Sequence, residues 1–279
     1  MMLSFRKILL FLFLILNLAL ANDNPQPEGE EIKVYRDTSA PNYIGEKDSI
    51  FLWSAVATFK RELTDGQLVA VAEDGYKSML ENIKNSNDVD LRRIPLVMVA
   101  MMHQAPDRQW TVYLASSAKG TASLIYKVRE AIDKKGECGE FWDTVPEDLK
   151  EALRECSKET GYSYHKNGGS CGEMNVLLEV AAGREDPKRI ASESTIVAWE
   201  GSQRKGVYKK GKVKAPCSDE GKYGCKDTLQ ALTDGIRVIE PKDDQDKGPT
   251  PEPYTGNMPV SVKYQPLWPG LETPQTAET

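Results

Sequence analysis

The chain has 279 residues and a net charge of −6 at pH 7. This length suits one domain of ordinary size with extensions. The excess of acidic residues excludes a general electrostatic attraction to nucleic acid or to anionic membranes, so any binding of a polyanion must be local.

The first 21 residues have the pattern of a secretory signal peptide. Arg6 and Lys7 precede an apolar run over residues 8–16, and the sequence Ala-Leu-Ala ends at residue 21. Such a segment is removed from the mature protein. The apolar run is shorter than the ~20 residues that a membrane-spanning helix needs. We therefore expect a secreted, extracellular protein with no stable membrane anchoring after signal cleavage; the oligomeric state is left open.

The first elements of the mature chain are a helix and a hairpin. A helix is expected over residues 64–83, where Thr64 and Gln67 occupy capping-box positions and apolar residues recur at helical spacing. Two apolar runs follow at 96–103 and 110–117, and a short polar turn separates them. Runs of this length and composition predict two buried strands that form a central hairpin.

The remaining elements alternate between helix and strand. Helices are expected over residues 122–134 and 146–159, from residue 171 onward and over 225–233, and strands over 195–200 and 235–240. A hairpin followed by helices and then by strand, helix and strand predicts an α/β fold with a mixed central sheet.

The composition changes at both ends of this domain. We expect a signal peptide at 1–21, an N-terminal extension at 22–47 and an α/β domain at 48–240 that carries a helical insertion at 120–165. The last segment, 241–279, holds eight of the sixteen prolines. A segment so poor in apolar residues buries too little surface to offset its ordering entropy, which predicts a flexible tail. Its last apolar residues could pack back on the body.

The five cysteines suggest a disulfide and a metal site. An odd number in a secreted chain leaves at least one cysteine unpaired within the molecule. Cys138 and Cys156 flank the insertion, and a disulfide between them would close that loop with an entropic effect of roughly 3 kcal/mol. Three cysteines remain, Cys171, Cys217 and Cys225.

Three thiolates with a fourth position open to water are a known catalytic zinc arrangement. Cys171 and Cys225 each stand at the start of a predicted helix. The free N–H groups and the dipole at that position favour the thiolate that zinc requires. Glu173 follows Cys171 by two residues, so its carboxylate could carry a proton from water to a departing amine. These residues predict a Zn²⁺ site.

The sequence Cys171-Gly172-Glu173, followed by Pro216-Cys217 and Cys225, resembles the cytidine deaminase-like superfamily. The most similar branch has cysteine in the first position and occurs in secreted fungal proteins and bacterial polymorphic toxins. The resemblance covers about residues 91–240 and implies a three-layer α/β/α sandwich with a mixed central sheet, which an N-terminal helical extension precedes. It also implies that the three cysteines are zinc ligands and that Glu173 is the proton shuttle. The implied reaction is hydrolytic deamination of a nucleobase in a nucleoside, a nucleotide or a single-stranded nucleic acid.

Other interpretations of the cysteines remain open. Seven residues separate Cys217 from Cys225, where the family has two, so Asp219 or Glu220 could replace Cys225 as the third ligand. Cys217 and Cys225 could instead form a disulfide, because disulfides are the usual fate of secreted cysteines. The protein would then be a non-catalytic secreted interaction protein. Cys171 could also be a nucleophile with a histidine, His165 or His103, as its base.

Four residues are weaker candidates for substrate contact. His165 precedes Cys171 and could line a pocket or orient a ligand, although a loop histidine with neither role is also expected. Asn175 follows the first motif and could face substrate or simply pack. Lys210 and Lys212 belong to a basic run over residues 204–214. That run could hold a phosphate backbone near the zinc or be a solvated loop.

Overall fold

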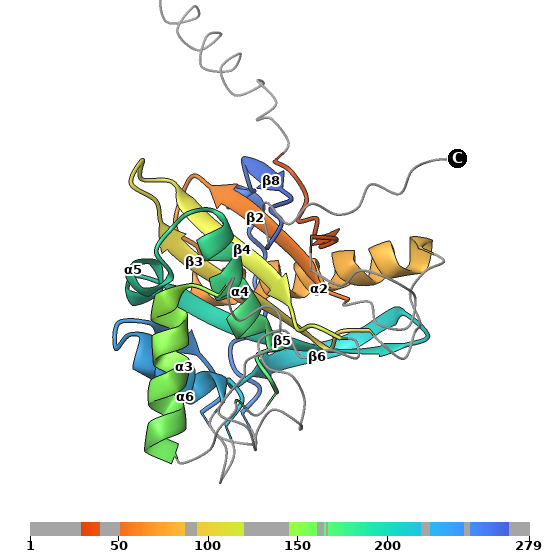
Figure 1. Ribbon diagram of the computed structural model, residues 1–279. Helices are drawn as coiled ribbons and strands as arrows, with labels where there is room; N and C mark the ends of the chain where they lie inside the picture. The colour runs from red at the N-terminus through yellow and green to blue at the C-terminus, as the bar shows by residue number, and fades with distance from the viewer. Residues whose placement is uncertain are drawn as a thin grey trace, which may run out of the picture.

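The computed structural model describes residues 29–39, 51–86, 94–119, 145–160, 165, 167–218, 224–242 and 246–267 of the chain. The strands in these residues are β1 (Tyr35–Arg36), β2 (Trp53–Phe59), β3 (Val97–Gln104), β4 (Trp110–Ser116), β5 (Thr195–Arg204), β6 (Val207–Lys214), β7 (Arg237–Ile239) and β8 (Ser261–Lys263). The helices are α2 (Asp65–Asn85), α3 (Glu147–Thr160), α4 (Gly172–Ala182), α5 (Pro187–Ser192) and α6 (Cys225–Leu232). Figure 1 shows their arrangement.

The strands form one mixed sheet. Its main order is β1-β2-β4-β3-β5-β6, with β7 beside β5 and β8 beside β2. The pair of β5 and β7 is parallel, and the other pairs are antiparallel. The two apolar runs form the central hairpin of β3 and β4, and their neighbours on either side bury them almost completely. The expected α/β fold with a mixed sheet is confirmed.

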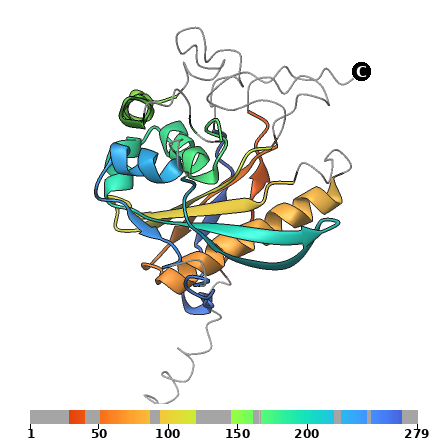
Figure 2. The same ribbon diagram turned by 90° about the horizontal axis from the view of Figure 1, so that it is seen from below.

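One face of the sheet is covered by α2 (Figure 2). The helix begins at a capping box, in which the Thr64 side chain accepts from the Gln67 N–H and the Gln67 side chain accepts from the Thr64 N–H. Its buried side packs on aromatic and sulfur-containing side chains of the sheet, such as Trp53 and Met98. At Gly201 of β5, an added Cβ would lie 2.2 Å from the Tyr76 ring. The close approach of α2 to β5 therefore requires glycine at this position.

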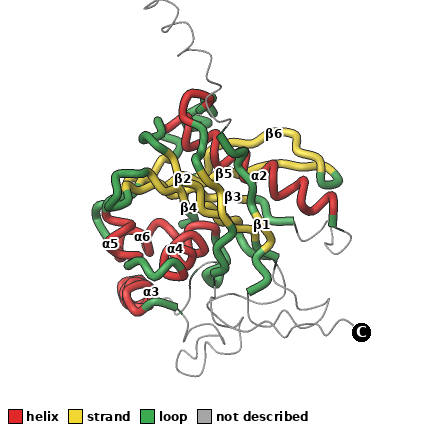
Figure 3. The backbone as a smooth tube through the Cα atoms, turned by 90° about the horizontal axis from the view of Figure 1, so that it is seen from above, coloured by secondary structure: helices red, strands yellow, loops and turns green. Residues whose placement is uncertain are grey.

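The opposite face carries α3, α4, α5 and α6, which group together in Figure 3. Val99 and Met101 of β3 point to this side, while Met98 and Ala100 point to α2, as the period of two along a strand requires. The first helical residue, Gly172, sits so close to β3 that a Cβ there would lie 2.5 Å from the Val99 side chain. This contact places the start of α4 directly on the central hairpin.

Most of the expected elements are found at their expected places. The helices expected over 64–83, 146–159, from 171 and over 225–233 correspond to α2, α3, α4 and α6, and the expected strands correspond to β3, β4, β5 and β7. The helix expected over 122–134 lies outside the described residues, as does the signal peptide. Five of the strands and α-helices described above were not expected: β1, β2, β6, α5 and β8. Most of the basic run over 204–214, for which a solvated loop was one expectation, forms the strand β6.

The C-terminal segment differs from the expected flexible tail. Residues 261–263 pair with β2, and the side chain of Leu267 is buried. The N–H of Leu267 and the hydroxyl of Tyr264 both donate to the buried carboxylate of Asp37. The tail is ordered there because its few apolar and aromatic residues add to surfaces that the domain already buries. Within the described residues, no helix has the length and apolar character needed to cross a membrane.

Candidate metal site

Cys171 lies at the start of α4, after a tight turn. It is the residue that precedes the first helical turn, with φ −78° and ψ 152°. Gly168 and Gly169 have positive φ angles of 58° and 75°, which glycine adopts without strain. The carbonyl of Ser170 accepts a hydrogen bond from the N–H of Ala118, just after β4. The turn is thus fixed to the end of the hairpin, and Cys171 lies over the central strands, near the end of β4.

Cys217 and Cys225 are brought together by the backbone of the second motif. Cys225 is the first residue of α6, and its N–H donates to the Cys217 Sγ over 3.2 Å. The N–H of Lys226 donates to the Cys217 carbonyl. A Cβ on Gly224 would lie 1.9 Å from that carbonyl oxygen. Only glycine allows this approach, so Gly224 explains how a seven-residue separation still returns Cys225 to Cys217.

Four donor atoms converge at this point. The Nε2 or Nδ1 atom of His165 and the Sγ atoms of Cys171, Cys217 and Cys225 all lie within 4.8 Å of one another. The Cys171 and Cys217 sulfurs are 3.5 Å apart, and the Cys225 sulfur is 3.5 Å from His165 Nε2. Ligands at Zn–S and Zn–N distances of about 2.3 and 2.0 Å on a tetrahedron are roughly 3.5–3.8 Å apart. The donor spacing therefore fits a tetrahedral ion.

The cluster is largely removed from solvent. His165, Cys171 and Cys225 are buried, and Cys217 is partly buried. Cys171, Cys217 and Cys225 are not joined by disulfides, so the alternative Cys217–Cys225 disulfide is wrong in this structure. Asn167 supports the cluster twice: its side-chain amide donates to Cys171 Sγ over 3.1 Å, and its backbone N–H donates to His165 Nδ1 over 3.2 Å.

The electrostatics of the sulfurs favour one thiolate, on Cys217. Hydrogen bonds from Cys171 and Cys225 hold the pKa of Cys217 far below its usual range. The hydrogen bond with Cys217 raises the pKa of Cys171, and burial raises that of Cys225. A protonated Cys171 is a poor nucleophile, which counts against the thiol-nucleophile interpretation. A soft cation would compensate the thiolate and allow the other two sulfurs to ionise.

Glu173 lies in the first turn of α4 with 5% of its surface exposed. Burial raises the pKa of its carboxyl, and the Cys217 charge acts in the same direction. Cys225 also interacts with this side chain. A buried carboxyl beside three sulfurs is costly unless a partner compensates it. Its position allows it to hold or release a proton beside any ion in the cluster.

The other predicted site residues have different places. Asn175 is buried, and its amide donates to the Ser116 carbonyl over 2.7 Å, so it ties α4 to β4. Lys210 and Lys212 are exposed on β6. His103 stacks on Tyr113 at a ring distance of 5.8 Å and is not part of the cluster. Cys138, Asp219 and Glu220 lie outside the described residues, so the pairing of Cys138 with Cys156 stays a prediction.

His165 is the donor that sequence reasoning did not assign. It was expected to line a pocket, to orient a ligand or to have no role, whereas the structure places it among the sulfurs. The His165 carbonyl accepts from the Gly168 N–H, and the Asn-Gly-Gly turn over 167–169 folds the histidine back over the helix start. The signal that could have indicated this is a histidine joined to a motif cysteine by a glycine-rich turn.

The residues fit a thiophilic transition metal such as zinc. Three sulfurs and an imidazole are soft or borderline ligands, which zinc prefers over the oxygen ligands of calcium or magnesium. The ligands come from two helix starts and two loops, and hydrogen bonds from Asn167 and Cys225 orient them. Supporting hydrogen bonds of this kind are typical of metal sites.

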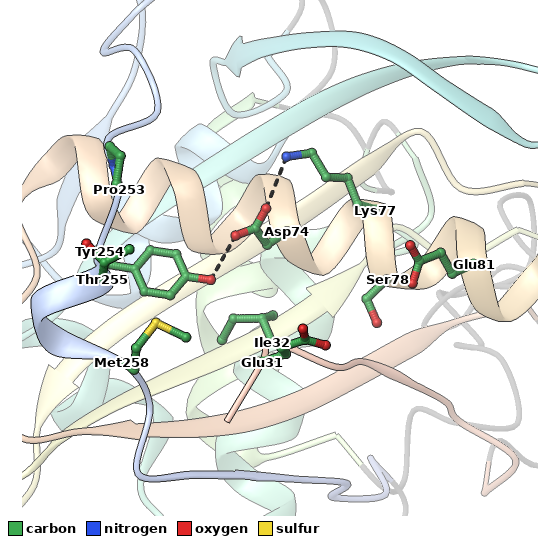
Figure 4. A pocket seen from close by; sticks show the side chains of 10 residues that line it. All are labelled: Glu31, Ile32, Asp74, Lys77, Ser78, Glu81, Pro253, Tyr254, Thr255 and Met258. Atoms are coloured by element: carbon green, nitrogen blue, oxygen red, sulfur yellow. Dashed lines mark hydrogen bonds and ion pairs between the residues drawn. The ribbon is translucent and has the colours of Figure 1, made fainter. Parts of the chain in front are cut away.

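A separate pocket of about 460 Å³ lies on the other face of the sheet, against α2 (Figure 4). Asp74 is at its centre, where it accepts from the Lys77 ammonium and the Tyr254 hydroxyl. Ile32 and Met258 contribute apolar surface. None of the four cluster residues lines this pocket, so the pocket does not give access to the cluster.

Comparisons with known proteins do not assign the chain to a family. No protein-family model matches the chain, no curated protein matches it, and no solved structure matches it. The case for a function therefore depends on the geometry of the cluster and on the order of the elements that hold it.

Proposed function

We propose that the protein is a secreted zinc-dependent hydrolase of the cytidine deaminase-like type, which removes the exocyclic amine of a nucleobase. One observation carries the proposal: the sulfurs of Cys171, Cys217 and Cys225 converge, and the buried carboxyl of Glu173, in the first turn of α4, interacts with Cys217 and Cys225. A site that only held a metal would have no need of that carboxyl. The substrate class is a base in a nucleoside, a nucleotide or a single-stranded nucleic acid.

The order of the elements supports the same proposal. The hairpin of β3 and β4 and the helix α3 are followed by α4, which Cys171 opens, and then by α5 and the hairpin of β5 and β6. Cys225 opens α6, and β7 then returns parallel to β5. This is the order that the resemblance to the deaminase-like superfamily implies, with both motifs at helix starts on one face of the sheet.

The hydrogen bonds of His165 support three sulfur ligands with a fourth position that can open. The N–H of Asn167 points at Nδ1, so Nδ1 accepts and the ring proton belongs on Nε2. Nε2 then donates to the Cys225 sulfur, 3.5 Å away. An imidazole that ligates a metal through Nε2 normally donates its other N–H to a neighbour, the reverse of this pattern. His165 is thus better placed to stabilise a thiolate than to close the site permanently.

The reaction needs an activated water and two proton transfers. Zinc, when bound, supplies a Lewis acid and lowers the pKa of water towards neutrality. Glu173 would move both protons of the attacking water in turn: the first goes to a ring nitrogen, and the second, from the hydroxyl then on the base, goes to the departing amine. Water and the amino base thus give the oxo base and ammonia. The buried surroundings keep bulk water away from these proton transfers.

Two glutamates of α4 provide a matched test. Glu173 and Glu179 are both buried, but only Glu173 interacts with the cluster cysteines. We expect Glu173→Gln to retain one zinc ion per chain and to lose about 10²- to 10⁴-fold in deamination rate, the usual contribution of a general acid–base. Glu179→Gln should keep the rate. The measurements are zinc content and ammonia release from cytosine, adenine and guanine substrates; equal rates for the two variants would contradict the role of Glu173.

A second function, a structural zinc centre, is favoured by one observation: His165 supplies a fourth donor, and closed four-ligand sites are usually structural. His165→Ala distinguishes the two. In the hydrolase, the variant keeps its zinc because three thiolates remain. In a structural centre, the loss of one of four ligands weakens zinc binding strongly, and no deamination is found in the unaltered protein. Competition with a chromophoric chelator measures the affinity.

A further inference from the structure

The ribbon formed by β5 and β6 carries a charge opposite to that of the chain. Residues 195–214 contain six basic residues and one acid, Glu200, in a chain whose net charge is −6. The strands are joined at Lys205 and Gly206, which both have positive φ angles, so the turn is tight. The ribbon extends past the other strands, beside α2 (Figures 1 and 2). This is a local basic surface of the kind that an acidic protein needs in order to hold a polyanion.

The register of the ribbon places alternate lysines on the face that carries the metal site. Lys214 lies opposite Ala198, and Lys212 lies opposite Glu200. Ala198 packs in the core beneath α4 and α6, so its cross-strand neighbour Lys214 points to the same face. The intervening Val213 points to α2. Lys210, which lies opposite Ser202, continues the row of Lys212 and Lys214.

The row of lysines begins next to the start of α4. Lys214, Ala198 and Val99 lie side by side on β6, β5 and β3, and Gly172 packs directly on Val99. Two strand spacings, or about 10 Å, separate the Lys214 backbone from this point. Along β6 the alternate lysines follow at intervals of roughly 6.8 Å. The row therefore leads from the neighbourhood of Cys171 outward along the ribbon.

The charges in this row are not equivalent. Lys214 forms an ion pair with Glu200, which neutralises it in part. Lys210 and Lys212 are exposed and extend into solvent. Lysines on an edge strand also discourage strand pairing between molecules, and this is the alternative explanation for them. That role does not require the lysines to share a face with the metal site, and it gives no salt-dependent binding.

We propose that Lys210 and Lys212 bind the phosphate backbone of a single-stranded nucleic acid whose target base enters the metal site. The inference rests on the proposed function and narrows its substrate class. Lys210 is roughly 14 Å along the strand from Lys214, so a free nucleoside or nucleotide at the cluster does not reach it. A polymer does, because its backbone continues past the reacting base. A membrane is a poorer fit, since the described part of the ribbon exposes only one large apolar side chain, Val207.

The test is the binding of a fluorescein-labelled single-stranded oligonucleotide to the full mature chain, measured by anisotropy between 50 and 200 mM salt. Each phosphate contact on a single strand contributes about −0.7 to the slope of log K against log salt. We expect Lys210→Ala with Lys212→Ala to reduce the slope by about 1.4 and to weaken binding. The matched control, Lys60→Ala with Lys263→Ala, removes the same charge from exposed positions off the ribbon and should leave the slope unchanged.

Three outcomes would overturn the inference: an unchanged slope in the ribbon variant, an equal loss in the control, or binding to phosphatidylglycerol vesicles without binding to the oligonucleotide. Zinc content and nucleoside deamination, measured on the same proteins, separate this inference from the proposed function. Zinc binding and nucleoside deamination without oligonucleotide binding would support the proposed function and exclude a polymeric substrate. Oligonucleotide binding without zinc binding or deamination would contradict the proposed function and support only a surface that binds nucleic acid. Circular dichroism of each variant checks that it is folded.

Discussion

The two faces of the sheet are built from different kinds of residues. Against α2, the core consists of large apolar and aromatic side chains such as Trp53, Phe59 and Tyr76. Against α4 and α6, the core contains the thiols and, beside them, the buried polar groups of His165 and Glu173. The α2 face contributes stability mainly through apolar burial, supplemented by hydrogen bonds such as that from the Tyr76 hydroxyl to the Gly201 carbonyl. The α4 face gains less stability from apolar burial because ionisable groups occupy part of its core. This difference indicates that the chemistry occurs on the α4 face.

The α4 face also contains groups that the structure does not fully satisfy. Within the described residues, neither carboxyl oxygen of Glu179 has a hydrogen-bond partner, and the Asn175 Oδ1 atom has none. Burying a polar group without a partner costs about 1–3 kcal/mol in proteins. Among the same described residues, the α2 face also has unpartnered polar atoms, the indole N–H groups of Trp53 and Trp199. The two faces differ in the thiols and carboxyls that the α4 face buries, so the order of the α4 face should depend more on a metal. The following changes test this dependence.

The largest effect is expected from loss of a metal ligand. Cys217→Ser removes the sulfur that holds the negative charge of the cluster, so stoichiometric zinc binding should disappear. In small zinc-binding peptides that binding provides about 10–16 kcal/mol. Amide hydrogen exchange should accelerate in α4 and α6 and stay slow in α2. Leu149→Ala on α3, in the same core but outside the cluster, is the control and should keep its zinc. Equal loosening of α2 in Cys217→Ser would contradict the independence of the faces.

A smaller effect is expected from a cavity on the α2 face, which should lower the stability of the protein and leave its zinc affinity unchanged. Leu68 of α2 is fully buried in the core between this helix and the sheet. Leu68→Ala should lower the free energy of unfolding by about 2–5 kcal/mol, because the removed methyl groups leave a cavity that the surroundings fill only in part. Urea denaturation measures this loss. The zinc affinity should stay the same, and a large fall in affinity would show that the two faces are coupled through the sheet.

The smallest effect is expected from Glu179, and it depends on pH. Burial, together with the nearby Asp37, raises the pKa of the Glu179 carboxyl well above its usual range. The folded state then binds a proton that the unfolded state releases above about pH 4.3, so the stability of the unaltered protein falls as pH rises, by up to about 1.4 kcal/mol per pH unit until the folded pKa is passed. Glutamine carries no charge in either state.

Glu179→Gln should therefore be more stable than the unaltered protein by a margin that is larger at pH 7 than at pH 5. Urea denaturation at both pH values checks this difference. A margin that does not change with pH would mean that Glu179 ionises equally easily in the folded and unfolded protein. In that case the α4 face would tolerate charge better than its burial indicates.

The regular elements and part of the site could be predicted because their signals are local. Helical periodicity and a capping box identified α2, and two apolar runs identified β3 and β4. Cysteines at two helix starts, with Glu173 beside the first, indicated the cluster. Strand β6 was missed because it lies at the edge of the sheet, where Val213 is its one fully buried residue. A strand of lysines has no apolar alternation from which to recognise it.

The sequence by itself determined the residue types of the site and the elements that carry them, since these depend on neighbours within a few positions. Tertiary structure decided the rest. It placed His165 among the sulfurs through a glycine turn, and it allowed Cys225 to reach Cys217 because Gly224 has no side chain. It also placed Lys210 and Lys212 on the same face as the cluster through the register of β5 with β6. These features depend on packing between residues far apart in the chain, which a local pattern does not encode.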